Sequence, residues 1–285
     1  MRHRPAGAVE CTYDPGHQGE KAGREGRRQA GRGAGPAMTV LILADRDDAT
    51  ADLVVRRLTA RHRKVHRFAL DDDVTLSATP GQLVVKDAHR TTANPRSVYW
   101  RCAGPVESAR ARELIGSLRA LPDLVWVNHP DSTERACRAE EQSEAAAECG
   151  LALAGGKRIR KKYDLRVTAV GGRLFPCRIV SALPDWRRDP DAVFQPVAVP
   201  RAVVRAVYRL MEWYGLYYAV LDFTVCPEGT WHFVGCDPNG PFCWLERRTG
   251  LSISSAIATL LAEEPDIQRD LKSPVGEHRR SSGQD

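Results

Sequence analysis

The chain has 285 residues, of which 42% are hydrophobic and 27% charged, a composition ordinary for a globular protein with one large or two modest domains. No run of eighteen apolar residues occurs, and no apolar stretch follows Arg2 and Arg4, which argues against a membrane span and a secretory signal. The eight cysteines never fall in C-x-x-C spacing, which argues against a zinc or iron–sulfur site. We therefore expect a cytoplasmic protein with reduced thiols and no membrane partner.

Half of the net charge of +6 lies in residues 1–37, which hold seven Arg and Lys against four Asp and Glu. This segment is rich in Gly and Arg and has almost no apolar periodicity. We expect a disordered basic tail over 1–37 and a second disordered tail over 266–285, with translation from Met38 as an alternative to the first. Because the basic residues form no patch on the fold and few aromatics lie among them, we expect no nucleic-acid partner.

Strand and helix patterns alternate over residues 38–150. We expect strands at 39–44, 64–69, 97–101 and 124–127, helices at 49–61, 106–120 and 132–149, and a hairpin of strands 74–78 and 82–86. This order predicts an α/β domain with an open sheet. Asp131 and Glu134 have capping-box spacing and Gly150 follows the last helical residue, so we expect them to bound a single helix.

The pattern changes after residue 150. Residues 151–162 break the alternation and are interpreted as a junction, and residues 163–265 are interpreted as a second, α+β domain. Its expected strands are 163–170, 173–181, 217–226 and 231–237, and its expected helices are 200–214 and 252–262. Gly171-Gly172 favours a tight hairpin between the first two strands, and Glu228-Gly229 indicates a turn between the other two.

An acidic residue, Asp222, lies in the middle of the apolar strand 217–226. A buried carboxylate needs a partner, because burial without one costs several kcal/mol. If Glu228-Gly229 is a two-residue turn, Asp222 lies opposite Gly235, and Asp237 follows on the same face. Together with the amide of Asn239, the two carboxylates suit Mg²⁺. The alternative is that residues 237–240, Asp-Pro-Asn-Gly, form only a turn, since all four residue types favour turns.

Two basic features precede that strand. Arg166 shares one face of strand 163–170 with Asp164 and Thr168, and its guanidinium can hold a phosphate. The alternative is an ordinary strand with one solvated face. The basic run 157–162 ends at Lys162, which is a candidate phosphate clamp. The alternative for this run is a solvated linker that charge repulsion keeps extended.

Three motifs occur in an order that resembles one family. They are Tyr163-Asp164-Leu165-Arg166-Val167-Thr168, Asp222-Phe223 and Asp237-Pro238-Asn239-Gly240. The chain resembles the ATP-grasp ribosomal peptide maturases, the graspetide or microviridin-type ligases. Residues 97–101 and 126–130 also look like that family's pre-ATP-grasp domain, so the resemblance extends from Met38 to about Ala262. It implies an N-terminal pre-ATP-grasp open sheet followed by an ATP-grasp domain.

The resemblance also implies an activity. ATP would phosphorylate an Asp or Glu side chain of a ribosomally made precursor peptide, and a Ser, Thr or Lys of that peptide would displace the phosphate to form an ester or amide cross-link. By motif match, Arg166 is the catalytic residue and binds the nucleotide beside Lys162, while Asp222, Asp237 and Asn239 hold Mg²⁺. The implied cofactors are ATP and Mg²⁺, the implied partner is the precursor peptide, and a homodimer is the assembly common in the family.

The sequence departs from the family pattern in three places. Where the family carries F-x-E-x-N-P-N-G, this chain has Gly235 in place of Glu and Asp237 in place of the first Asn. The chain passes from Gly150 to Tyr163 without the subdomain that supplies nucleotide-clamping lysines, and Ala139-Glu140 replaces a Lys-Pro pair. We therefore expect an incomplete ATP-grasp domain and keep two hypotheses. They are an ATP-dependent ligase and a catalytically inactive peptide- or partner-binding remnant of one.

Overall fold

The computed structural model describes residues 39–102, 109–156 and 159–262, so the two expected tails, 1–37 and 266–285, lie outside the described residues. The first sheet is parallel and four-stranded. Its order is β2 (Lys64–Phe68), β1 (Thr39–Leu43), β6 (Ser97–Trp100) and β7 (Val125–Val127). This arrangement confirms the open α/β sheet.

Helices and a hairpin cover both faces of this first sheet. Helix α1 (Ala49–Ala60) packs on one face, and α2 (Ala109–Arg119) packs on the other. The face that α2 covers also receives apolar side chains of a small antiparallel sheet formed by β3 (Thr75–Thr79), β4 (Gln82–Lys86) and β5 (Thr91–Ala93). The hairpin was predicted from its turn residues, whereas the short β5 was not.

The second sheet is six-stranded and mixed. Its order is β11 (Val193–Pro196), β10 (Arg173–Val180), β9 (Tyr163–Val170), β12 (Tyr218–Val225), β13 (Trp231–Asp237) and β8 (Ala152–Leu153). The alternating faces predicted for β9 and β12 are confirmed, because their odd-numbered residues from 165 to 169 and from 219 to 225 pack in one core cluster. The sequence pattern missed β8 and β11.

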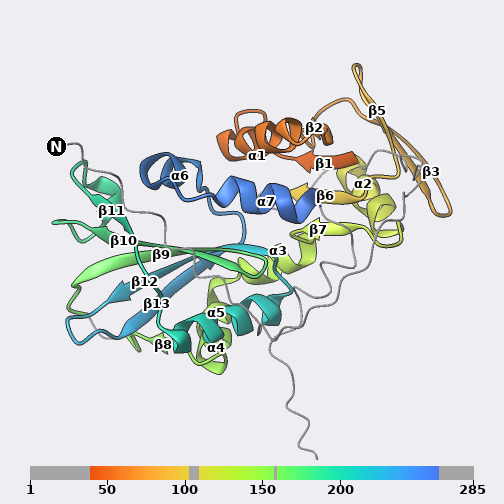
Figure 1. The fold of residues 1–285 in the computed structure, drawn as a ribbon. Helices are drawn as coiled ribbons and strands as arrows, with labels where there is room; N and C mark the ends of the chain where they lie inside the picture. The colour runs from red at the N-terminus through yellow and green to blue at the C-terminus, as the bar shows by residue number, and fades with distance from the viewer. Residues whose placement is uncertain (1–38, 103–108, 157–158, 263–285) are drawn as a thin grey trace, which may run out of the picture.

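This larger sheet lies between two layers of helices (Figure 1). One face is covered by α4 (Ala139–Glu148) and α5 (Arg201–Tyr214), whose apolar residues recur at helical spacing. The opposite face is covered by α6 (Cys243–Thr249) and α7 (Ile253–Ala262). Among the described residues, no helix has the length and apolar character needed to cross a membrane.

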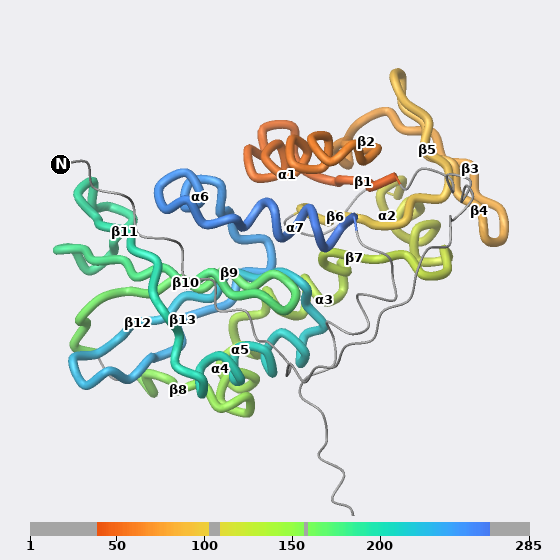
Figure 2. Tube along the Cα trace, viewed as in Figure 1, coloured from red at the N-terminus to blue at the C-terminus, as the bar shows by residue number. Residues whose placement is uncertain are grey.

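Helix α7 joins the two sheets, and Figure 2 shows its trace running between β6 and β9. Arg57 on α1 donates its Nε–H to the Ser254 hydroxyl at 3.0 Å, and the buried Ser97 hydroxyl on β6 donates to the carbonyl of Leu261 at 2.7 Å. Helix α7, the last helix among the described residues, therefore packs on the first sheet. The division into domains at 151–162 stays a prediction.

The helix predicted over 132–149 is wrong in its extent, because two helices occupy this region. Helix α3 spans Pro130–Ala136, and Arg138 interrupts the helical backbone with an extended conformation (φ −78°, ψ 103°) before α4 begins. The Gln142 side chain donates to the Ala136 carbonyl at 2.6 Å and so satisfies a group left without a helical partner. The predicted capping box is also wrong, since the imidazole of His129 accepts the first helical N–H at 3.2 Å.

Candidate functional site

The hairpin of β12 and β13 brings Asp222 opposite Gly235, as predicted, although the predicted two-residue turn is wrong. The N–H of Cys226 donates to the Thr230 carbonyl, and Val225 pairs with Trp231, so the loop is longer than predicted. A β-bulge between Asp222 and Phe223 restores the register, because one residue of β13 has no partner there. The longer loop shifts the strand register by one residue and the bulge shifts it back, so Asp222 still pairs with Gly235.

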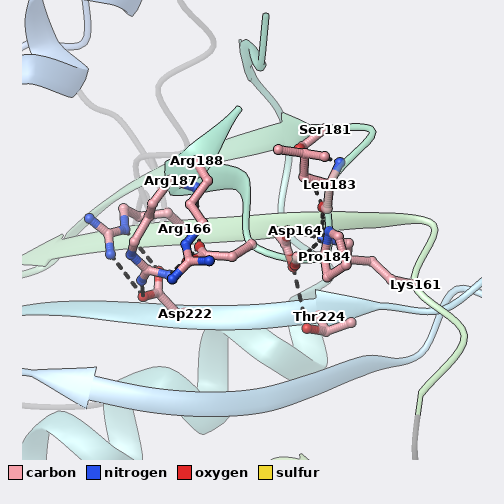
Figure 3. A network of polar contacts seen from close by, with 11 residues as sticks. Lys161, Asp164, Arg166, Ser181, Leu183, Pro184, Arg187, Arg188, Asp222 and Thr224 are labelled. Carbon is pink, nitrogen blue, oxygen red and sulfur yellow. Dashed lines mark hydrogen bonds and ion pairs between the residues drawn. The ribbon is translucent and has the colours of Figure 1, made fainter. Parts of the chain in front are cut away.

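Arg166 of β9 lies directly across from Asp222 of β12, and the two side chains form a bidentate ion pair (Figure 3). The Nε and Nη2 of Arg166 donate to the two carboxylate oxygens at 2.8 Å each. A third N–H comes from Arg187, whose Nη2 donates to Oδ2 at 3.1 Å. Burial lowers the pKa of Arg166, but the hydrogen bond and charge of Asp222 outweigh it and leave that pKa raised. Arg166 is therefore the partner that the mid-strand carboxylate requires.

Two tryptophan rings cover the buried Arg166 guanidinium, and a phenylalanine ring packs against both of them. They come from the 3₁₀ helix η1 (Trp186–Arg188), from Phe194 on β11 and from Trp244 on α6. The guanidinium carbon of Arg166 lies 5.3 Å from the centroid of the Trp186 ring and 5.6 Å from that of Trp244, and those two rings lie 5.4 Å apart. Such cation–π contacts hold Arg166 toward the sheet. Sequence reasoning missed these aromatics because no local pattern links positions so far apart.

Asp237 and Asn239 lie in a turn that follows β13. The exposed Asp237 accepts the backbone N–H of Asn239 at 2.9 Å through Oδ1, which is the local bond expected of an Asp in a turn. The Asn239 amide donates to the Cys102 carbonyl at 3.2 Å, and the Asn239 carbonyl accepts from Nη1 of Arg101 at 3.1 Å. The Asp237 side chain therefore makes the local bond of a turn, which was the alternative to its role as a metal ligand. The same turn also contacts the end of the first sheet.

Arg101 carries that contact onward to the first helix. Its Nε donates at 2.7 Å to the carboxylate of Asp48, which also accepts the N–H groups of Thr50 and Ala51 and so caps α1. Burial raises the pKa of Asp48, but the charge and hydrogen bonds of its partners outweigh burial and leave the pKa lowered. An ionised Asp48 therefore links α1 through Arg101 to the loop that holds Asn239.

The same loop is packed tightly at Gly240. A Cβ added there would lie 2.6 Å from Cγ2 and 2.7 Å from Cβ of the buried Val220, closer than atoms can approach. The hydroxyl of the buried Tyr218 also donates to the Gly240 carbonyl, and burial raises the pKa of Tyr218 well above its ordinary value, which keeps it protonated. Glycine is therefore required for this loop to contact β12.

We expect Gly240→Ala to lower the free energy of unfolding by about 1–3 kcal/mol, because the loop or Val220 must move. Urea denaturation followed by circular dichroism measures this loss. The matched control is Gly235→Ala, whose new Cβ would meet only the Gln142 side-chain oxygen at 3.6 Å. We expect the control to change stability little, and equal losses in the two variants would contradict the close contact at Gly240.

The basic run does not bring Lys162 to the ion pair. Lys162 is exposed, and its backbone N–H donates to the Val225 carbonyl at 2.8 Å. The ammonium of the preceding Lys161 donates to Asp164 at 2.7 Å and to two loop carbonyls, at Leu183 and Pro184 (Figure 3). Lys161 therefore fastens a loop, and a nucleotide contact of Lys162 stays a prediction.

The predicted metal ligands do not fit a magnesium ion as they are arranged. A carboxylate has about four acceptor positions, and three of those of Asp222 receive N–H groups from two guanidinium cations. Gly235 offers no side-chain oxygen opposite it, and Asp237 accepts a bond from its own turn. Within the described ranges, no group of three His, Cys, Asp or Glu residues is placed to hold a metal ion.

No protein-family model matches the chain, and no curated protein sequence matches it. Solved structures do match. Macrocyclase MdnC from Microcystis aeruginosa MRC, bound with precursor peptide MdnA, aligns at TM-score 0.67 and 22% identity over 80% of this chain and 100% of that one. The Chryseobacterium gregarium RiPP-associated ATP-grasp ligase, in complex with ADP and a leader and core peptide, aligns at TM-score 0.68 and 19% identity over 79% and 96%.

A third structure, ATP-grasp ligase PsnB complexed with minimal precursor, Mg and ADP, aligns at TM-score 0.63 and 15% identity over 81% of this chain and 98% of that one. This chain has the ATP-grasp fold. The expected succession of an open sheet and an ATP-grasp α+β segment is thereby confirmed at the level of fold. The homodimer, the cytoplasmic location and the roles assigned to the site residues stay predictions.

Proposed function

We propose that this chain binds a ribosomally made precursor peptide and does not itself catalyse ATP-dependent ligation. It would be a catalytically inactive relative of ATP-grasp peptide ligases. The observation that carries the proposal is the state of Asp222, whose carboxylate is neutralised by Arg166 and Arg187 and faces a glycine. Support for the partner comes from the matched structures, since MdnC is bound with precursor peptide MdnA and the Chryseobacterium ligase with a leader and core peptide.

The loss of catalysis follows from what phosphoryl transfer requires. The reaction depends on positioning and on cations that neutralise the charge developing on the phosphate oxygens. The residues that bind the metal ions are therefore essential for catalysis. Gly235 removes one carboxylate, and the chain between Gly150 and Tyr163 is short, with only the two-residue strand β8 among its described residues. A nucleotide bound beside this sheet would be open to water, which weakens its electrostatic interactions.

The second candidate is an active ATP-grasp ligase that uses ATP and Mg²⁺. It is favoured by the contact of Arg166 with Asp222 and by the charge of Asp237, which, like that of Asp222, raises the pKa of Arg166. On this hypothesis Arg166 would contact the phosphates, and the two aspartates with Asn239 would hold the metal after the ion pair opens. It requires Asp222 to exchange its guanidinium partners for a metal ion.

Titration calorimetry of the full chain separates the two candidates. One titrant is Mg²⁺ with ATP, and the other is the peptide encoded by the reading frame adjacent to this gene. We expect the peptide to bind with a Kd of about 1 μM, equivalent to about −8 kcal/mol, and Mg²⁺ with ATP to give no binding heat. Magnesium-dependent ATP binding that Asp222→Asn abolishes would establish the ligase candidate instead. Absence of peptide binding by a folded chain would contradict the proposed partner.

A further inference from the structure

Arg187 reaches Asp222 from a loop that the sequence motifs do not include. The loop connects β10 to β11 over residues 181–192 and carries the 3₁₀ helix η1. Arg187 places Nη2 3.1 Å from Oδ2 of Asp222, on the oxygen that also accepts Nη2 of Arg166 at 2.8 Å. The close-up in Figure 3 shows the two arginines converging on the one carboxylate. Arg187 is thus a second cation at Asp222, the residue that the sequence motifs predicted as a metal ligand.

The loop that carries Arg187 is held by its own contacts. Asp189 accepts the Ser181 hydroxyl at 2.6 Å and the Ala182 N–H at 3.0 Å, which closes the loop on itself. Asp185 caps η1 by accepting the backbone N–H of Arg187 at 3.1 Å. Lys161 fastens the start of the loop from outside through two carbonyls. The Arg187 backbone is therefore ordered before any ligand arrives.

The Arg187 side chain is positioned as well. Its guanidinium carbon lies 4.7 Å from the centroid of the Trp186 ring, and its Nη1 lies 3.4 Å from Asp185. Trp186 in turn packs edge to face against Phe194, with ring centroids 5.9 Å apart. A guanidinium stacked on a ring and paired with two carboxylates has a preferred place beside Asp222, even though its side chain is 55% exposed.

We propose that Arg187 is a built-in cation that takes the place of a divalent metal at Asp222 and keeps magnesium out. A divalent ion approaching Asp222 would meet two guanidinium charges, and displacing Arg187 would remove one of these charges and free a second acceptor position on the carboxylate. The inference deepens the proposed function, because it names the residue that closes the metal site. The test of this inference is independent of the test of peptide binding.

The test measures Mn²⁺ binding to the full chain by electron paramagnetic resonance, with Mn²⁺ replacing Mg²⁺ as the probe. A second carboxylate is supplied by Gly235→Glu, since a Cβ at this position is 3.6 Å from its nearest neighbour. We expect Gly235→Glu combined with Arg187→Ala to bind Mn²⁺ at least tenfold more tightly than Gly235→Glu alone. Combining Gly235→Glu with Arg187→Lys should leave the affinity weak, because the positive charge remains.

The matched control is Arg188→Ala in the Gly235→Glu background. Arg188 lies in the same short helix, its side chain is 84% exposed, and its Nε lies 4.0 Å from the Asp185 carboxylate. We expect no gain from it, and an equal gain would overturn the proposal by showing a general charge effect. The proposal is also overturned if Mn²⁺ binds equally well, or not at all, with and without Arg187. Binding of Mg²⁺ with ATP by the unmodified chain would overturn the proposed function by a separate measurement.

Discussion

Replacing Asn128 by Ala is expected to lower the free energy of unfolding by about 3–5 kcal/mol, because the side chain satisfies four backbone groups. Asn128 is 1% exposed. Its Nδ2 donates to the carbonyls of Tyr218 and Pro238 at 2.8 and 3.0 Å, and its Oδ1 accepts the N–H groups of Tyr217 and Tyr218 at 2.8 and 3.0 Å. The substitution leaves these groups without a partner in a region closed to water. A loss of this size is a large part of ordinary protein stability.

Urea denaturation followed by tryptophan fluorescence measures the effect of Asn128→Ala. Asn128→Asp tests its cause, since it keeps the size of the side chain but turns a second acceptor toward two carbonyls, and we expect it to be at least as destabilising. The neighbouring control is His129→Ala, which removes a 3.2 Å capping bond and an edge contact with the Trp126 ring at a partly exposed position, and it should cost about 0.5–2 kcal/mol. A loss below about 1 kcal/mol in Asn128→Ala would mean that water reaches these groups.

Asp222→Ala is expected to lower the free energy of unfolding by about 2–4 kcal/mol, because it leaves the guanidinium of Arg166 buried without its carboxylate. The side chains of Arg166 and Asp222 are 10% and 24% exposed, so solvent reduces the penalty below that of a fully buried pair. Arg166 retains its cation–π contacts with Trp186 and Trp244 in that variant, but it loses both hydrogen bonds to the carboxylate. Chemical denaturation monitored by circular dichroism gives the loss.

Removal of both charges separates the ion pair's structural contribution from its other roles. Arg166→Met with Asp222→Leu fills similar space with apolar groups, and we expect it to recover most of the stability lost in Asp222→Ala. Arg166→Met alone should be intermediate, because Asp222 keeps Arg187 as a partner. Losses that simply add in the double variant would show that the two side chains do not interact.

The two sheets are joined near the Asp237–Gly240 turn by contacts of Asn128, Arg101 and helix α7. Asn128 follows β7 of the first sheet, yet it bonds both β12 and the carbonyl of Pro238. Arg101 follows β6 and bonds the carbonyl of Asn239. The turn is therefore bonded from both sheets, and this is why we expect Asn128, which is remote from Asp222 in sequence, to affect the stability of this region.

Local patterns in the sequence determined the strands of the site and the faces of their side chains. Alternation placed Arg166 and Asp222 on corresponding faces of β9 and β12, because side chains in a strand point in turn to opposite sides. The pairing of Asp222 with Gly235 was correct only because a bulge offset a longer loop. The helix predicted over 132–149 failed at Arg138, because Gln142 bonds both the nearby Ala136 carbonyl and the distant Cys236 on β13, and a local pattern does not contain the second bond.

Only the tertiary structure decided which groups meet Asp222. Its first partner depends on β9 and β12 being neighbours in the sheet, although 56 positions separate Arg166 from Asp222. Its second partner, Arg187, comes from a loop placed by hydrogen bonds of Asp189 and by ring packing of Trp186. The spacing of residues in the sequence does not predict such contacts, because ion pairs form between whichever opposite charges the folded chain brings within a few ångströms of each other. The sequence therefore predicted that Asp222 needs a partner, and only the packed structure identified the guanidinium groups of Arg166 and Arg187 as that partner.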